Sequence, residues 1–472
     1  MASGVGADGT EVERRDPYAA LRFADFRYLM GATLLGTLGE QMLTVAIGWE
    51  IYARTHQAVM LGYVGLAQFL PLLLLSLVAG HAADRFDRRV IVVFAQSFVA
   101  LTSIGLMIVS VTHGPVWIIF PLLAVRGAAD GFAVAASGAL PPQTVPQSAF
   151  ENAASWSSSL FQVAAVSGPA LAGVLIAARG SAATVYILDA VAGLISVALI
   201  SRIRGKQEAR STEPMTLDGL MGGVRFIWKT PVILAAITLD MVAVLLGGAT
   251  TLLPIYASDI LHVGSIGLGV MVATPSVGAL LMATTRAYLP PFRHAGRTLL
   301  LAVAGFGAVT VIFGVSRWFP LSLAALFALG AFDNISVVIR KTLMLTQVPD
   351  ELRGRLAAVN NVFIGTSNQL GGFESGVTAQ FFGPVLSVAL GGVGSVLCVV
   401  AIAYAWPDLR RLGGLTTPAK LVAPRPAPTS APTLSPQRRG VARRASRCEG
   451  EGRRSGGHSS SPQRRRLAAA QK

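Results

Sequence analysis

Long apolar runs limit the possible folds of this sequence more than any other feature. Between Tyr28 and Trp406 these runs alternate with short polar breaks. A helix needs about 20 mostly apolar residues to cross the hydrocarbon core of a bilayer. Twelve runs approach or exceed this length, and they lie near residues 28–53, 61–83, 90–112, 116–140, 153–178, 182–201, 232–256, 266–288, 298–315, 319–345, 357–382 and 384–406. Because they are apolar on every side rather than alternating, they argue against a membrane β-barrel and predict an all-α membrane protein with twelve transmembrane helices.

The composition disfavours the other broad classes of protein. Hydrophobic residues make up 53% of the 472 residues, and charged residues only 13%. Disordered chains have low hydrophobicity, and soluble domains carry about 25% charged residues. The first 26 residues are polar and carry charges of both signs, so we expect no cleavable signal peptide.

Basic residues indicate the orientation in the membrane. If the N-terminus is cytoplasmic, twenty Lys and Arg residues before position 408 fall in cytoplasmic segments, and only Arg54, Arg179 and Arg317 fall in external loops. Loops rich in Lys and Arg remain on the cytoplasmic side. We therefore expect both termini to be cytoplasmic.

A repeat and one long polar break divide the chain into parts. Several residues recur at a constant offset of 203, and the matched positions are Gly127 with Gly330, Asp130 with Asp333, Gly168 with Gly371, and Gly173 with Gly376. The break separates the two copies, as in transporters built from parallel repeats. We therefore predict a cytoplasmic N-terminal segment (1–26), an N-terminal six-helix half (27–201), a cytoplasmic linker (202–231), a C-terminal six-helix half (232–406) and a disordered basic cytoplasmic tail (407–472).

The positive charge is concentrated in the tail. Residues 408–472 hold fifteen Lys and Arg and three acidic residues, which gives +12 of the formal net charge of +15. Pro, Ser, Gly and Arg dominate this segment without apolar periodicity, as in disordered chains. We therefore expect no nucleic-acid partner. Contact of the tail with anionic lipid headgroups is one hypothesis, and an inert extension is the alternative.

The sequence does not indicate a site for a common cofactor. It lacks the phosphate-binding pattern G-x-x-x-x-G-K-[ST] and the zinc pattern H-E-x-x-H. The two cysteines, Cys398 and Cys448, cannot supply a four-ligand zinc site, and the six histidines are scattered. We expect no cofactor, no metal site and no enzymatic activity.

The loop between the second and third runs carries the strongest local motif. Residues 80–89 read G-H-A-A-D-R-F-D-R-R, which resembles the signature loop G-x-x-x-D-R-x-G-R-R of the major facilitator superfamily. The resemblance implies that a glycine allows close helix approach and that charged side chains latch and release the two halves during alternating access. The residues of this latch are Gly80, Asp84, Arg85, Arg88 and Arg89. As an alternative, the arginines only follow the positive-inside rule. Asp87 replaces the usual glycine of the turn.

The fifth run contains a Gly-Pro pair, Gly168 and Pro169, followed by Gly173. Residues 164–173 resemble the antiporter motif g-x-x-x-G-P-x-x-G-G of drug-exporting major facilitators. The pair removes a backbone donor and side-chain bulk, which predicts a kink and a close packing surface where the halves meet. An ordinary kinked helix is the alternative. The resemblance favours export over uptake.

Two further segments are similar to one branch of that superfamily. Residues 21–27 (L-R-F-A-D-F-R), and then Gly39-Glu40-Gln41 with Trp49, resemble the drug:H⁺ antiporter-3 branch. This branch includes macrolide-efflux pumps and enterobactin exporters and is also called transmembrane secretion effector. The resemblance implies a multi-pass transporter of the bacterial inner (plasma) membrane that exports a small amphipathic compound, drug-like or siderophore-like, by proton antiport. Its expected partners are that compound, protons and the lipid bilayer, and we expect a monomer.

Ionisable residues inside apolar runs are expensive in lipid and therefore mark candidate functional sites. Proton antiport requires a carboxylate at which proton and substrate compete. Glu40 is the first candidate, because no basic residue lies near it in its run. Asp130 is the second, because Arg126 precedes it by four residues, so that both share a helix face and can pair. Asp333 repeats Asp130 in the other half.

Each of these assignments has a structural alternative. Arg126 and Asp130 can form a fixed ion pair, and Glu40 can be a solvated cavity residue without a coupling role. Asp240 is a further candidate, whereas Asp189 is expected near the outer end of its run.

Two alternatives concern the whole protein. An importer or uniporter of the same fold is one, although the Gly-Pro motif favours export. The other is a non-transporting membrane sensor or assembly protein, against which the carboxylates inside the apolar runs argue.

Overall fold

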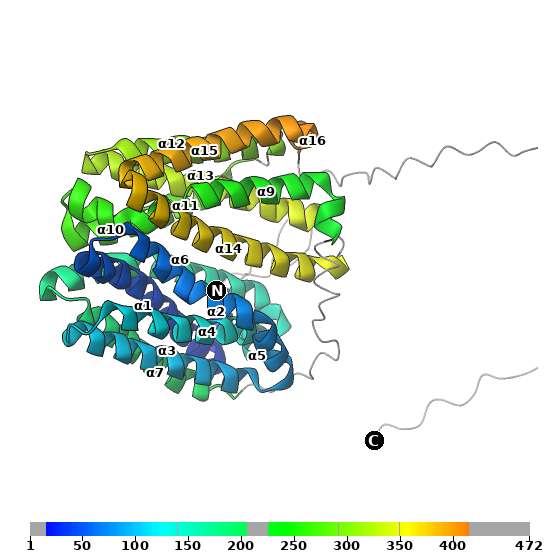
Figure 1. The fold of residues 1–472 in the computed structure, drawn as a ribbon. Coiled ribbons are helices and arrows are strands. Elements are labelled where there is room, and N and C mark those ends of the chain that lie inside the picture. Colours follow the sequence, from blue (N-terminus) through cyan, green and yellow to red (C-terminus); the bar gives the residue numbers. More distant parts are fainter. Residues whose placement is uncertain (1–15, 139, 205–224, 291, 349, 415–472) are drawn as a thin grey trace, which may run out of the picture. The chain divides into compact units, whose positions relative to one another are not determined.

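The computed structural model describes residues 16–138, 140–204, 225–290, 292–348 and 350–414. Every regular element in these ranges is a helix, and no strand occurs within them (Figure 1). The predicted N-terminal segment, linker and tail lie largely outside the described residues.

Each predicted apolar run overlaps one long helix. The long helices are α1 (Ala24–Thr55), α2 (Ala58–Arg85), α3 (Arg88–Val111), α4 (Ile119–Ser137), α6 (Phe150–Arg179), α7 (Ala183–Ser201), α9 (Pro231–Leu246), α11 (Gly264–Tyr288), α12 (Ala295–Val315), α13 (Phe319–Gln347), α14 (Asp350–Phe382) and α15 (Pro384–Ala405). The short ones are η1 (Ala20–Arg22), η2 (Val116–Ile118), α5 (Pro141–Thr144), η3 (Gln147–Ala149), η4 (Ala249–Leu252), α10 (Leu253–Ile255), the π-helical η5 (Tyr256–Ile260) and α16 (Pro407–Arg411).

Among the described residues, ten helical stretches are long and apolar enough to cross a membrane. Helices α1 and α14 are outside these ten. Both carry polar residues in their middle parts, Glu40 and Gln41 in α1 and Asn368, Gln369 and Glu374 in α14. The all-helical fold is therefore confirmed. The ten candidate spans indicate a multi-pass membrane protein.

Local backbone chemistry sets many of the helix ends. Helix α1 ends at His56, which has a φ of 51°, and α6 ends at Gly180, which has a φ of 68°. A left-handed residue after the last turn is a common helix terminator. Pro231 and Pro384 occupy the first positions of α9 and α15, where their fixed φ suits a helix start and no intrahelical N–H is required.

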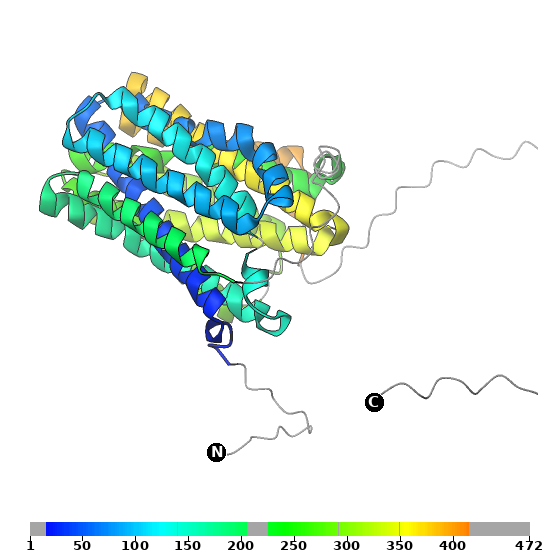
Figure 2. The same ribbon diagram turned by 90° about the horizontal axis from the view of Figure 1, so that it is seen from below.

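The long helices form two groups that contact each other along two pairs of helices. In the first group α1 packs on α6 and α7, α2 packs on α4, and α3 packs on α4 and α7. In the second group α9 packs on α14 and α15, α11 packs on α13, and α12 packs on α13 and α15. Figure 1 shows the first group below the second, and Figure 2 shows the long helices running side by side. The main contacts between the groups are those of α6 with α11 and of α2 with α14.

The buried core differs between the two ends of the bundle. At the end where α1 finishes, called the joined end here, one hydrophobic cluster includes residues of both groups, such as Ile47 and Leu123 from the first and Leu268 and Leu326 from the second. At the end where α1 begins, called the separated end, the described buried clusters each belong to one group only. The two groups are therefore packed together mainly at the joined end.

Glycine contacts repeat at the offset of 203 residues. A Cβ at Gly168 would meet Gln41 and Met42 of α1, and one at Gly371 would meet Val244 and Leu245 of α9. The contacted positions differ by the same offset as the two glycines.

The second glycine pair lies between the groups. A Cβ at Gly173 would meet Ser265 of α11, and one at Gly376 would meet Gly62 of α2, again at an offset of 203. Both glycines permit the close approach of backbones that joins the two groups.

Large apolar side chains cover much of the outside of the bundle. Leu74, Val134 and Leu301 are 68%, 69% and 71% exposed. Contiguous exposed apolar surface is uncommon on soluble monomers. A lipid environment accounts for this surface, because apolar side chains meet apolar acyl chains there.

Candidate functional site

A buried ion pair lies among α3, α4 and α7 of the first group. The guanidinium of Arg126 donates from Nη1 to Asp189 Oδ2 over 2.7 Å and to Ser103 Oγ over 2.9 Å. The Ser103 hydroxyl in turn donates to Asp189 Oδ2 over 2.5 Å. The side chains of Arg126 and Asp189 are only 4% and 3% exposed. Charge-assisted hydrogen bonds of this kind offset part of the free energy that burying two charges requires.

Arg126 forms an ion pair with Asp130, as the spacing of residues indicated, and has a second and closer partner in Asp189. Its Nε lies 3.9 Å from Asp130 Oδ2, which is too far for a hydrogen bond. Asp189 is the main partner, and it lies two turns inside α7 rather than near a helix end. An i,i+4 pair is visible within one helix, whereas the contact with Asp189 joins two helices. The one sequence signal for it is that Asp189 is the sole acidic residue of α7.

Gly39 makes room for this ion pair. A Cβ at Gly39 would overlap the carboxylate of Asp189. The side chain of the next residue, Glu40, extends from α1 near this ion pair and interacts electrostatically with both of its members.

Glu40 and Asp130 are the accessible carboxylates near the ion pair. The Glu40 side chain is exposed, and the Asp130 side chain is 33% exposed. Glu40 interacts electrostatically with Asp130, Arg126 and Asp189. No described residue donates a hydrogen bond to its carboxylate, so this group is available to a proton or a ligand. The sequence showed no basic residue near Glu40 in its own helix, and it did not reveal that Arg126 of α4 acts on Glu40.

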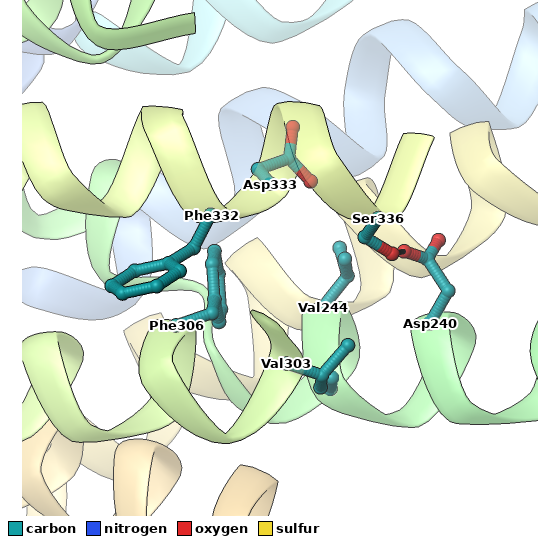
Figure 3. Close-up of a pocket in the computed structure, with 8 residues that line it drawn as sticks. Asp240, Val244, Val303, Phe306, Phe332, Asp333 and Ser336 are labelled. Carbon is teal, nitrogen blue, oxygen red and sulfur yellow. Dashed lines mark hydrogen bonds between the residues drawn. The ribbon is translucent and has the colours of Figure 1, made fainter. Parts of the chain in front are cut away.

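A second buried ion pair lies between α9 and α13 of the other group. Arg340 Nη2 lies 2.8 Å from Asp240 Oδ1, and Ser336 donates to the same oxygen over 3.4 Å. Figure 3 shows Asp240 and Ser336 facing each other across the two helices, beside a cavity of about 10 Å³ that Asp333 also lines. Such a cavity is at the lower limit for a single water molecule. The predicted candidate Asp333 thus lies near the ion pair without belonging to it.

Three hydrogen bonds of the signature loop join it to its own helix group. Asp87 caps α3 by accepting from the backbone N–H of Arg89 over 2.9 Å, so no glycine is needed at this turn. Arg89 donates to the Ile203 carbonyl over 2.6 Å, and Arg88 donates to the Ala83 carbonyl over 3.4 Å.

The other latch candidates are not engaged. Among the described residues, no side-chain hydrogen bond or ion pair is made by Asp84 or Arg85. A Cβ at Gly80 would meet nothing within 4 Å, so the close approach that the resemblance implies for this glycine is absent here. This loop lies at the separated end, where the described buried clusters do not join the two groups.

The Gly-Pro segment lies where the two groups meet. Helix α6 continues through Pro169 to Arg179. Gly168 faces α1, whereas Gly173 faces α11, where its carbonyl accepts from Ser265 Oγ over 3.2 Å. The predicted close packing surface is thus present around these residues.

Polar contacts also cross between the groups at the joined end. Tyr52 Oη of α1 donates to Asp259 Oδ2 of the π-helical η5 over 2.5 Å. The backbone N–H of Val59 donates to Gln380 Oε1 over 3.5 Å. The sequence alone gave no indication of these pairs, because their partners are more than 200 positions apart.

A large cleft separates α6 and α11 toward the separated end. Its volume is about 930 Å³, and its lining residues are Glu151, Ala154, Ser155, Ser158, Ser159, Gln162, Val163, Val166, Ser167, Leu280 and Ala283. This size matches pockets that bury drug-sized ligands, which measure about 300–1,000 Å³. The same two helices that touch at Gly173 and Gly269 are therefore apart here.

Comparison with known proteins identifies the relatives of this chain. The model of a family described as transmembrane secretion effector matches residues 15–439. The multidrug efflux pump Tap of Mycolicibacterium fortuitum is 26% identical over 399 residues, covering 81% of this chain and 96% of Tap. The enterobactin exporter EntS of Citrobacter koseri is 25% identical over 394 residues, covering 82% of this chain and 92% of EntS.

Solved structures share the fold. A bacterial homologue of the human lysosomal transporter Spinster, in an inward-facing and unoccupied conformation, aligns with a TM-score of 0.62 at 13% identity, covering 82% of this chain and 96% of that one. The peptide transporter POT aligns with a TM-score of 0.66 at 11% identity, covering 82% and 95%. At these identities the likeness concerns the fold alone.

Proposed function

The chain belongs to the transmembrane secretion effector family of the major facilitator superfamily, and from this premise we propose that it exports a small amphipathic compound by proton antiport with alternating access. The predicted family is confirmed, and the chain is a membrane transporter rather than an enzyme. One observation carries the direction of transport. Two efflux proteins, a multidrug pump and an enterobactin exporter, align with four-fifths of this chain and nearly all of their own length.

The proposed topology has twelve spans in the bacterial inner membrane, with both termini cytoplasmic and a monomer as the transporting unit. Helices α1 and α14 complete the twelve, because they pack lengthwise on spans of the same bundle. The glycine contacts at an offset of 203 residues support two equivalent six-helix halves, at 27–201 and 232–406, joined by the linker at 202–231.

In this topology the joined end faces the outside and the separated end faces the cytoplasm. The contacts at Gly173 and Gly376 would then close the external side, and the cleft between α6 and α11 would open inward. The unpaired Asp84 supports the same interpretation. A latch at residues 80–89 engages the other half only when the cytoplasmic side closes.

Glu40 and Asp130 are the proposed proton carriers. Both carboxylates are accessible, and both lie beside Arg126, whose charge is held by Asp189. A proton and a cargo molecule cannot occupy the same carboxylate, so the arrival of one accompanies the departure of the other. The fixed ion pair keeps the surroundings of these carboxylates constant while they exchange partners.

Inverted membrane vesicles containing the full chain test this proposal. An inward-acid gradient should drive accumulation of an amphipathic dye, and an uncoupler should abolish it. Glu40→Gln should lower gradient-driven accumulation by more than about tenfold, since general acid–base groups contribute at least about a hundredfold where proton transfer limits the rate. Asp84→Asn should slow turnover, and Asp408→Asn, at an exposed acid of α16, is the matched control.

Each alternative function predicts a different result in the same vesicle assay. Equal accumulation by Glu40→Gln and wild type would contradict the coupling assignment. No gradient-dependent flux for a broad panel of compounds would contradict export and favour a sensor or assembly protein. Accumulation only in right-side-out vesicles would favour an importer.

A further inference from the structure

A turn near the N-terminus crosses the start of α6 at the separated end. This turn, called the belt here, consists of residues 16–25 and leads into α1. The Pro17 carbonyl accepts two hydrogen bonds from α6, one from Asn152 Nδ2 over 2.8 Å and one from Trp156 Nε1 over 3.0 Å. The side chain of Asn152 also accepts from the backbone N–H of Ala20 over 3.0 Å. Two side chains of α6 therefore hold the backbone of the belt.

Apolar packing supports the same contact. The centroid of the Tyr18 ring lies 6.1 Å from that of the Trp156 ring. Ala20 is fully buried, in a cluster that also includes Ala149 and Ala153 at the start of α6. These hydrogen bonds and this burial offset the conformational entropy that the belt loses when it is ordered against α6.

The other end of the belt is bonded to the residues that follow α7. Asp25 Oδ2 accepts from the backbone N–H of Arg204 over 3.2 Å. The carbonyl of the neighbouring residue, Ile203, accepts from Arg89 of the signature loop over 2.6 Å. Ile203 is also buried in the cluster that holds Ala20. The belt and two residues after α7 therefore form a continuous line of contacts from the signature loop to α6.

The part of α6 that the belt contacts also lines the cleft. Glu151 and Ser155 are lining residues. Each is followed directly in the helix by a residue that holds the belt, Asn152 or Trp156. Consecutive residues of an α-helix point about 100° apart, so the belt lies on a face of α6 next to the wall of the cleft. A displacement of the belt would move this wall, because both belong to the same helical turns.

The sequence of the second half does not repeat these contacts. At the offset of 203 residues, Arg355 is the counterpart of Asn152, and Val359 is the counterpart of Trp156. An arginine side chain has no acceptor, and a valine side chain has no donor. The two positions therefore cannot make the full set of bonds that holds the belt, which makes the belt contacts a feature of the first half and not of the repeat.

We propose that the belt transmits movement of the signature loop to α6, so that engagement of the loop with the other half narrows the cleft at the same time. Asn152 and Trp156 are positioning residues in this arrangement, because they hold α6 to the belt and do not line the cleft. This inference rests on the proposed alternating access, and it connects the cytoplasmic latch of that mechanism to one wall of the cleft.

Spin-label distances in the purified full chain test this transmission, since a line of contacts alone does not demonstrate coupling. Both natural cysteines are replaced by alanine. One label pair, at Ser158 of α6 and Ala283 of α11, spans the cleft. A second pair, at the exposed Val78 of α2 and Val362 of α14, reports on the side of the signature loop. The perturbation is Asp84→Asn, which removes the charge of the latch.

The expected result is a shift that depends on the belt at one label pair only. In the otherwise wild-type chain, Asp84→Asn should lower the ratio of short to long distances at least about fivefold at both pairs, within the range of coupled residues. In a chain with Asn152→Leu and Trp156→Phe, the shift should persist between α2 and α14. Between α6 and α11 it should fall below about twofold, as for independent sites.

Two outcomes of the distance measurement would overturn the proposal. Equal shifts across the cleft with and without the belt contacts would mean that the loop acts on α6 by another route. No shift at either pair in the otherwise wild-type chain would mean that Asp84 starts no movement that the belt could transmit.

Transport kinetics distinguish positioning from cargo binding. In inverted vesicles the double variant should lower the maximal rate of dye accumulation at least about threefold, because conformational steps limit many turnover rates. The half-saturating dye concentration should not change. Trp156→Phe alone keeps a ring beside Tyr18 and should lose less, and Trp117→Phe, at an exposed tryptophan of η2, is the matched control. A raised half-saturating concentration with an unchanged maximal rate would contradict the positioning role.

This inference and the proposed function fail in different ways. Without gradient-driven accumulation by the wild type, export would be contradicted, while the distances across the cleft would still support or overturn the role of the belt. Normal export together with equal distance shifts in both backgrounds would overturn the role of the belt alone.

Discussion

The buried arginines of the two helix groups differ in how completely their hydrogen-bonding groups are met. Arg126 binds Asp189 and Ser103 over 2.7 Å and 2.9 Å, with accessible carboxylates beside it. Arg340 binds Asp240 over 2.8 Å, but its Nε has no partner among the described residues, and the nearby cavity holds about 10 Å³. The first cluster makes short hydrogen bonds and has accessible carboxylates beside it, whereas the second leaves a buried Nε without a partner among the described residues.

The difference shows that the repeat preserves packing and one aspartate, at Asp130 and Asp333, but not the buried arginines. Gly127 and Gly330 match at the offset of 203, and each lets α4 or α13 approach a neighbouring backbone. Position 329, the counterpart of Arg126, is a leucine, and position 137, the counterpart of Arg340, is a serine. Equivalent backbones thus carry different charges, and in the proposed mechanism only the first half couples protons.

Arg126→Met is expected to have the largest effect, because it leaves Asp189 buried without its partner. Removing one member of a buried ion pair destabilises proteins by about 3–5 kcal/mol. Thermal unfolding of the purified full chain measures this loss. The double variant with Asp189→Asn removes the stranded charge and should recover most of the stability. Wild-type stability of the single variant would show that the ion pair does not hold α4 and α7 together.

Ser103→Ala and Ser336→Ala sharpen the comparison between the two clusters. Hydrogen bonds to charged groups contribute about 1.5–3 kcal/mol. Ser103 makes two such bonds, at 2.9 and 2.5 Å, and its loss should fall in this range. The bond of Ser336 is 3.4 Å long, so its loss should be below about 1 kcal/mol. Chemical denaturation of both variants gives the difference, with Ser97→Ala as control, and a larger loss for Ser336→Ala would reverse the ranking of the clusters.

Gly173→Ala and Gly376→Ala test the equivalence of the two contacts at the joined end. A Cβ would lie 2.5 Å from the Ser265 carbonyl oxygen in the first case and 3.0 Å from the Ala58 carbonyl oxygen in the second. Overpacking destabilises by about 1–3 kcal/mol, so both variants should shift the population away from contact at this end, Gly173→Ala the more. Spin-label distances between α6 and α11 measure the shift. No change in these distances would mean that the glycines do not limit closure.

Removal of residues 415–472 is expected to have the smallest effect. These residues hold most of the net positive charge and lie outside the described part of the chain. Transport by the truncated chain should equal that of the full chain. Loss of flux with normal membrane insertion would assign the tail a role in transport.

The sequence predicted the helices well, because apolar length is a local property. Every predicted run overlaps a long helix, and the repeat offset located the glycines of the interhelical contacts. The signature-loop and Gly-Pro motifs indicated the superfamily, and residues 21–27 with Gly39-Glu40-Gln41 and Trp49 indicated the confirmed family.

The sequence did not predict which side chains meet across helices. The i,i+4 spacing selected Asp130 for Arg126, whereas packing brings Asp189 closer, because the orientation of α4 against α7 decides the contact. The Tyr52–Asp259 bond and the serine-lined cleft were missed for the same reason. The serines that line the cleft lie on one face of α6, and a polar face of this kind produces no apolar periodicity in the sequence.

Proton release upon cargo binding most directly tests the proposed difference between the halves. Purified wild-type protein in weakly buffered solution, mixed with a saturating amphipathic cargo, should acidify the medium. Asp333→Asn should release as many protons as wild type, because its carboxylate lines a cavity of only about 10 Å³. Glu40→Gln should bind the cargo and release fewer protons than wild type, because Asp130 remains. Undiminished proton release by Glu40→Gln, or its loss in Asp333→Asn alone, would contradict the assignment of proton coupling to the first six helices.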